Sequence, residues 1–177
     1  KVTIISFERQ LNMKEGTLSK TCVVEMPDGV RLRIASKRLV SMVSVEIGTI
    51  HYAITAENAD CSLCVKSQIQ SRVYNQDSNY DECFWESVSQ QNDDEAIVAV
   101  DRTIPNPYDV PQFTIATAIT HTYSHAVSKA HTTDDLELNE VVGLKLKKGE
   151  TFVIEKYAAQ VSTLNYKAEE LPSVAVE

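Results

Sequence analysis

The chain has 177 residues, 43% of them hydrophobic, which is enough for one domain with a core of its own. Its formal net charge of −8 disfavours nucleic acid and anionic membranes as partners, because both are bound through basic patches that this sequence lacks. No apolar run approaches the ~20 residues of a membrane span, and no signal-peptide pattern is recognisable. We therefore expect a cytoplasmic protein with no nucleic-acid or membrane partner. The polar pattern at the end and a start without Met suggest a fragment of a longer chain.

Apolar and polar residues alternate through the first half of the chain, which is the pattern of half-buried strands. Strands are expected over residues 2–7, 17–26, 30–35, 43–56 and 60–70, with a turn over 11–16. Pro27-Asp28-Gly29 is a strong turn signal, so the second and third strands should form a hairpin. The inward side chains of 17–36 and 43–70 are expected to supply the core.

The second half continues the same pattern. Further strands are expected over 96–100, 112–123, 141–146 and 151–161, with a turn at 147–150. Pro105, Pro107 and Pro111 cannot donate ladder hydrogen bonds, so their segment should be an extended connection or a sheet rim. Helical periodicity is scarcely visible. The sequence thus predicts an all-β fold, a large antiparallel two-sheet β-sandwich.

The least generic stretch runs from Asn75 to Glu86. It combines side chains that bond locally to backbone with large aromatics: Asn75, Asp77, Asn79, Tyr80, Asp81, Phe84 and Trp85. In one interpretation it is an ordered connection, whose turn is held by Asp77, Asn79 and Asp81 and whose aromatics Phe84 and Trp85 pack into the core. In the other it is a sugar-binding or partner surface, with Tyr80 and Trp85 as the platform.

Two clusters could suggest metal or redox chemistry. Cys61 and Cys64 have the spacing of a redox or zinc pair, but they lie within an expected strand, and free, buried thiols are favoured. His121 and His125 would share a face on a helix, whereas on a strand they lie about 13 Å apart. With His131, they are expected to be surface or edge histidines. We expect no metal and no disulfide.

No motif for nucleophilic catalysis or nucleotide binding is present, and the chain has only five glycines. Asp77, Asp81 and Glu82, or the run Asp93-Asp94-Glu95, could be imagined as a glycosidase acid and base. Such runs in turns are usually solvated charge. The sequence therefore offers no catalytic residue and no cofactor site.

Several motifs nevertheless resemble one family, the disaccharide phosphorylases of glycoside hydrolase family 65, in their amino-terminal β-sandwich. The resemblance covers almost the whole chain and is nearest to the maltose and kojibiose type. It rests on Leu11-Asn12-Met13-Lys14-x-Gly16-x-Leu18, Arg38-Leu-Val-Ser41-Met42, Ile50-x-Tyr52-x-Ile54-x-x-x-Asn58 and Asn75-x-Asp77-Ser78-Asn79-Tyr80-Asp81-Glu82-x-Phe84-Trp85. The family usually has Asp where Asn12 stands and often Arg where Lys20 stands.

The resemblance implies a galactose mutarotase-like super-sandwich over residues 1–165, incomplete at its start, and the beginning of a linker over 166–177. In the family the linker leads to an (α/α)6 barrel, where a glutamate acts as general acid and inorganic phosphate attacks the anomeric carbon with inversion. It thus implies a parent phosphorylase in carbohydrate metabolism, a glycosyltransferase or hydrolase by class, with phosphate as co-substrate and no cofactor. This part is expected to be inactive, supporting the barrel and a homodimer. The alternative is an autonomous carbohydrate-binding module using Tyr80 and Trp85.

Overall fold

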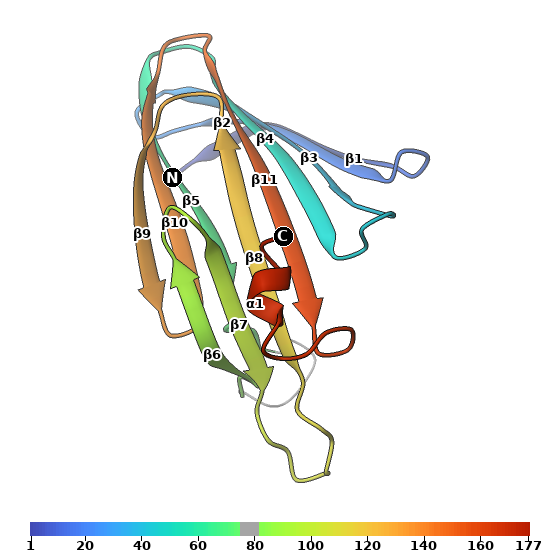
Figure 1. Cartoon of the computed structure of the whole chain (residues 1–177). Coiled ribbons are helices and arrows are strands. Elements are labelled where there is room, and N and C mark those ends of the chain that lie inside the picture. Colours follow the sequence, from blue (N-terminus) through green and yellow to red (C-terminus); the bar gives the residue numbers. More distant parts are fainter. Residues whose placement is uncertain (75–81) are drawn as a thin grey trace. The chain divides into compact units, whose positions relative to one another are not determined.

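The computed structural model describes residues 1–74 and 82–177, and in those residues nearly all regular structure is strand. The strands are β1 (Thr3–Asn12), β2 (Thr17–Glu25), β3 (Arg31–Val40), β4 (Ile47–Ala56), β5 (Cys61–Gln70), β6 (Trp85–Asn92), β7 (Ile97–Thr103), β8 (Thr114–Tyr123), β9 (Ser128–Asp134), β10 (Glu137–Leu146) and β11 (Thr151–Ser162). A short helix, α1 (Leu171–Val174), follows near the end (Figure 1).

The strands form two antiparallel sheets, as the sequence predicts. The larger sheet has the order β1-β2-β3-β4-β11-β8-β7-β6, and the smaller has the order β5-β10-β9. The chain also divides into two compact units. The first unit comprises Lys1–Val65, His121–Lys129 and Val142–Tyr157, and the second comprises Lys66–Thr120, Ala130–Val141 and Ala158–Glu177.

In the first unit, the core is supplied by side chains from both sheets. Leu32, Ile54 and Phe152 of the larger sheet pack with Val142 and Leu146 of the smaller one, and all five are buried. This arrangement is a β-sandwich, in which the inward residues of each strand meet those of the facing sheet. The prediction of an all-β sandwich is confirmed.

In the second unit, strand β7 is covered on both faces. Ile97 and Ala99 pack against Leu138 of the smaller sheet, whereas Val98 and Val100 belong to a cluster with Leu171 of α1. Successive residues of a strand point to opposite faces, and both faces of β7 are covered. Five consecutive residues of β7 are therefore buried. Helix α1 is thus part of the packed unit, although residues 166–177 carry the polar pattern from which a linker is expected.

Most predicted strands are present, although several bounds differ: β3 ends at Val40 instead of residue 35, and β10 starts at Glu137 instead of residue 141. Strand β1 continues to Asn12, so its turn occupies only residues 13–16. Strand β4 starts at Ile47 instead of residue 43, because the Ser41 hydroxyl accepts hydrogen bonds from the backbone of Val43 and Ser44 and turns the chain there. Strands β6 and β9 were not predicted, because their residues are largely polar.

Candidate functional site

The predicted functional loop is only partly described. Asn75, Asp77, Asn79, Tyr80 and Asp81 lie outside the described residues, so the turn expected from their side chains stays a prediction. Phe84 and Trp85 are described. They lie at the start of β6, where the backbone N–H of Ile104 donates to the carbonyl of Phe84 at 3.0 Å.

Phe84 and Trp85 do not form the buried plug that the sequence suggests. Phe84 is 38% exposed, so the expectation that it packs inward is wrong. Trp85 is half-buried and packs edge-to-face on Phe113, with ring centroids 5.4 Å apart and an interplanar angle of 85°. Phe113 is itself exposed. The physical reason is that the ring partners of this segment come from another exposed connection and not from the core.

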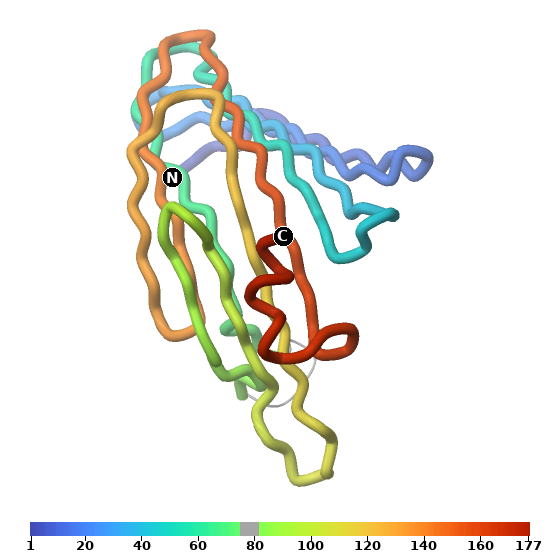
Figure 2. Tube along the Cα trace, viewed as in Figure 1, coloured from blue at the N-terminus to red at the C-terminus, as the bar shows by residue number. Residues whose placement is uncertain are grey.

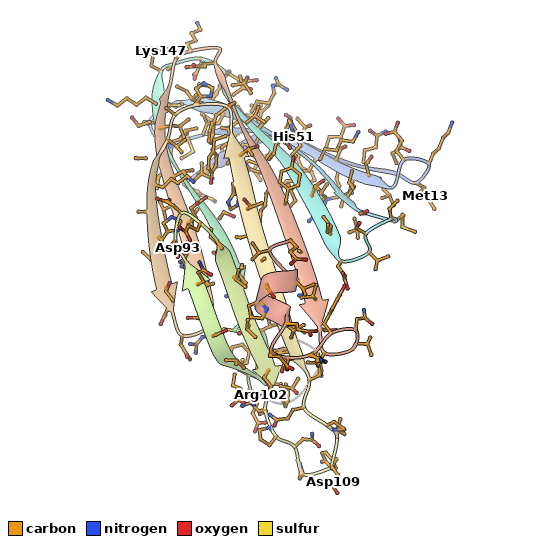
Figure 3. All side chains as sticks on the ribbon, viewed as in Figure 1. Met13, His51, Asp93, Arg102, Asp109 and Lys147 are labelled. Carbon is orange, nitrogen blue, oxygen red and sulfur yellow. The ribbon has the colours of Figure 1, made fainter. Side chains whose placement is uncertain are left out.

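That connection is the proline-rich segment 104–113 between β7 and β8, which Figure 2 shows as a yellow excursion of the chain. Asn106 holds it: its side-chain oxygen accepts from the backbone N–H of Tyr108 at 2.9 Å, and its amide donates to the carbonyl of Val110 at 2.8 Å. Asp109, labelled at the tip in Figure 3, has a positive φ of 54°, which Asp tolerates. The extended connection predicted from the prolines is confirmed.

A groove of about 550 Å³ lies between the start of β6 and this segment. Its described lining residues are Glu82, Phe84, Thr103, Ile104, Pro105, Asn106, Pro107, Tyr108, Val110, Pro111 and Phe113. Glu82 is the one charged side chain among them, and none is Lys, Arg or His. Such a lining offers apolar and aromatic contact but no cation that could hold phosphate.

Family-motif residues elsewhere in the chain hold turns. Asn58 clamps the turn between β2 and β3: its amide donates to the carbonyl of Gly29 at 2.9 Å, and its side-chain oxygen accepts from the backbone of Arg31 at 2.7 Å. Asn12 accepts from the backbone N–H of Glu15 in the first turn. Gly29 needs its freedom here, since its φ is 83°. Asn12 and Asn58 therefore have a structural role, because their side chains stabilise turns.

Asp101 is the most deeply buried acid among the described residues of the second unit, and it was not among the predicted site residues. Asp101 is 1% exposed, and its carboxylate accepts a hydrogen bond from the Ser71 hydroxyl. Burial raises the pKa of Asp101, and the Ser71 hydrogen bond offsets this only in part. Its other carboxylate oxygen has no hydrogen-bond partner among the described residues. The signal that could have found Asp101 is the continuous apolar run of residues 96–100 just before it, because such a run is typical of a strand covered on both faces.

Of the histidines singled out above, His125 and His131 contact acidic side chains, whereas His121 is partly buried on β8, which is not an edge strand. His125 follows β8 and lies 2.9 Å from Glu150, whose pKa is lowered by the backbone N–H of Lys147 and then by His125. His131 lies on β9, an edge strand as expected, and contacts Asn92 and Asp94 at 3.1 Å each. Among residues 1–74 and 82–177, no group of three potential ligands could hold a metal ion.

The four cysteines are free thiols, and their burial differs. Cys22 is buried and Cys61 is partly buried. Cys64, however, is exposed, so the expectation of a buried thiol is wrong there. Alternation along β5 explains the difference, because residues three apart point to opposite faces. In the described parts of the chain, no helix has the length and the apolar composition to cross a membrane.

Comparisons with known proteins agree with the fold. A maltose phosphorylase of Bacillus subtilis (strain 168) is 29% identical over 171 residues, which are 97% of this chain but 22% of that protein. A solved structure described as "Putative kojibiose phosphorylase from human microbiome" superposes with a TM-score of 0.84 at 16% identity, over 99% of this chain and 22% of that one. The chain thus spans about a fifth of the length of these relatives. The family model "Glycosyl hydrolase family 65, N-terminal domain" matches residues 1–177, and the chain belongs to that family.

Proposed function

We propose that this chain is the non-catalytic N-terminal domain of an inverting disaccharide phosphorylase. The parent enzyme would convert an α-glucosyl disaccharide such as maltose, with inorganic phosphate, into glucose 1-phosphate and glucose. The observation that carries the proposal is that the match to the family 65 N-terminal domain fills the chain, which corresponds to only 22% of the maltose phosphorylase. The catalytic acid and the phosphate site would then lie in the part that follows.

The aromatic groove and the buried Asp101 support a non-catalytic role. Inverting phosphorolysis needs a carboxylic acid on one face of the sugar and a held phosphate on the other. The aromatic groove has a single acid, Glu82, and no cation among its described residues. Asp101 is buried beneath the sheet surface, where no sugar can reach it. We propose that the domain supports the catalytic barrel and a homodimer, in a cytoplasmic enzyme without a cofactor, and that residues 166–177 begin the linker.

The second candidate is a carbohydrate-binding module. The exposed rings of Phe84 and Tyr108 on the groove favour it, because sugar rings stack on accessible aromatic faces. In this second candidate function, Trp85 and Tyr80 would belong to the sugar-binding platform, as expected from the sequence. The lining side chains with donors or acceptors are Glu82, Thr103, Asn106 and Tyr108, and Asn106 already bonds within its own segment, which weakens the case, since sugar sites need several such groups.

The test is an assay of the complete polypeptide with maltose, trehalose, kojibiose and nigerose, each with and without phosphate. The proposal expects glucose 1-phosphate from one of them, and only with phosphate. Release of glucose without phosphate would show a hydrolase instead. Calorimetric titration of the same sugars into the Phe84→Ala and Tyr108→Ala variants tests the second candidate, which expects weaker binding in both.

A further inference from the structure

The aromatic groove beside the proline-rich segment is poor in hydrogen-bond donors. Its described lining includes residues that have no backbone N–H group, namely Pro105, Pro107 and Pro111. Other lining residues already donate their backbone N–H groups to protein oxygens, namely Thr103, Ile104, Tyr108, Val110 and Phe113. A ligand that must accept several hydrogen bonds therefore finds few backbone donors in this groove.

Side chains of the segment use up several of these donors. The side-chain oxygen of Asn106 accepts from the backbone N–H of Tyr108 at 2.9 Å and from that of Val110 at 3.3 Å. The Thr103 hydroxyl accepts from the backbone N–H of Phe113 at 3.1 Å. The Asn106 amide is also used, because it donates to the carbonyl of Val110 at 2.8 Å. The segment thus satisfies its donors internally and does not turn them toward a ligand.

The groove instead presents aromatic rings and one carboxylate. Phe84, Tyr108 and Phe113 line it and are all exposed, Tyr108 by 83%. The Phe113 ring is held in place by Trp85, which packs on it edge-to-face at 5.4 Å between centroids. Glu82 is the one charged side chain of the described lining. The face of an aromatic ring carries partial negative charge, so the rings and the carboxylate attract the same kind of ligand, a cation.

We propose that the aromatic groove binds a small molecule that carries a quaternary ammonium group on an apolar body. Its positive charge would lie against the rings of Phe84, Tyr108 and Phe113. The Glu82 carboxylate would balance that charge. The groove volume of about 550 Å³ lies within the range of small-molecule sites. The proposal goes beyond the proposed function, because this groove has no part in phosphorolysis.

Other ligands fit less well. A phosphate needs a cation, and the described lining has none. A sugar needs donors as well as acceptors, and most of the backbone donors are used. A primary ammonium group has three N–H donors and needs several acceptors, whereas a quaternary ammonium group has no N–H and needs none. The methyl groups of the quaternary ammonium also match the apolar lining.

Calorimetric titration of the complete polypeptide with choline tests the proposal, because an uncharged probe of the same shape exists. In 3,3-dimethylbutan-1-ol a carbon atom replaces the nitrogen of choline, which removes the charge and keeps the methyl groups. We expect one choline per chain and roughly 10-fold weaker binding of the alcohol, since attraction to the rings and to Glu82 acts only on the charge.

Variants of the groove locate the binding. Glu82→Gln should weaken choline binding roughly 5-fold, because it removes the carboxylate and keeps the shape. Asp109→Asn is the matched control: Asp109 lies at the tip of the same segment (Figure 3) but outside the described lining, so the wild-type affinity should remain. Phe84→Leu keeps an apolar contact but removes the ring, and should weaken choline binding, whereas Phe84→Tyr should preserve it. Tm values close to that of the wild type establish that each variant is folded.

Four results would overturn the proposal. No choline binding to the complete polypeptide would show that the groove takes no such cation. Equal binding of choline and of the alcohol would show an apolar groove without selectivity for charge. Unchanged choline binding in both Glu82→Gln and Phe84→Leu would place the cation elsewhere. Binding of maltose that Phe84→Leu weakens, without binding of choline, would favour the carbohydrate-binding module. The phosphorylase assay remains separate, because choline binding is measured without sugar or phosphate.

Discussion

Truncation of Phe152 should destabilise the chain far more than truncation of Trp85, although tryptophan is the larger residue. Phe152 is fully buried in the core cluster of the first unit, where its ring stacks on Tyr123 with centroids 6.0 Å apart and meets His125 edge-on at 5.7 Å. Phe152→Ala leaves a cavity with no solvent access. We expect a loss of about 3–5 kcal/mol, the range for a buried aromatic.

Trp85→Ala should cost less than the sequence analysis implied. If Trp85 were fully buried, the loss of stability in Trp85→Ala would lie in the same range of ~3–5 kcal/mol. The ring is only half-buried, and its aromatic partner Phe113 is 46% exposed. Partial burial plus an edge-to-face pair worth about 0.5–1.5 kcal/mol gives an expected loss of roughly 1–3 kcal/mol.

Urea unfolding of both variants, followed by far-ultraviolet circular dichroism, measures the comparison directly. Dichroism is needed because Trp85→Ala removes the single tryptophan. In thermal scans, Phe152→Ala should lower Tm by roughly 6–20 °C, at about 2–4 °C per kcal/mol for a chain of this size. A Trp85→Ala loss equal to or larger than that of Phe152→Ala would refute the burial assigned to both rings.

Three further predictions concern polar residues. Burial raises the pKa of Asp101, so the native state binds this proton more tightly than the unfolded chain, and stability falls as the pH rises above the usual carboxyl range. Asp101→Asn should reduce this dependence of stability on pH and be no less stable than the wild type at neutral pH. A large loss of stability at neutral pH would contradict the raised pKa. The backbone N–H of Lys147 and the His125 side chain lower the pKa of Glu150, so its contribution to stability is present at neutral pH and is lost as the pH falls below the ordinary glutamate pKa. Unfolding of Glu150→Gln should depend less on pH in that acidic range than unfolding of the wild type, and parallel curves would contradict the lowered pKa. Asn58→Ala removes two hydrogen bonds from the turn between β2 and β3 and should cost about 1–3 kcal/mol in urea unfolding, more than Asn58→Asp, which keeps the acceptor for Arg31.

The strands that the sequence predicts well are those with one buried face. Strands β2, β3 and β5 alternate because one side of each meets the core; the bounds of β2 and β5 agree with the expected ranges to within one residue, whereas β3 continues five residues beyond its expected end. Strand β6 carries mostly polar residues, and β9 is exposed along nearly its whole length. Both are held by hydrogen bonds to a neighbouring strand, which leave no hydrophobic pattern in their own sequence.

The candidate site was harder to predict because its contacts join residues that are far apart in the sequence. The family motif located the start of β6, but the partner of Trp85 lies on a connection 28 residues further along the chain. Only the fold brings Phe113 to Trp85. Asp101 is a similar case, because its burial depends on cover from two other elements of the second unit.

The most direct test of the account is a phosphorolysis assay of the 177-residue chain beside the complete polypeptide, both with maltose and phosphate. We predict glucose 1-phosphate from the complete polypeptide and none from the chain alone, because the aromatic groove has a single acid, Glu82, and no phosphate-holding cation among its described lining residues. Phosphate-dependent release of glucose 1-phosphate by the chain alone, abolished when one of its own acids is replaced, would contradict the central claim.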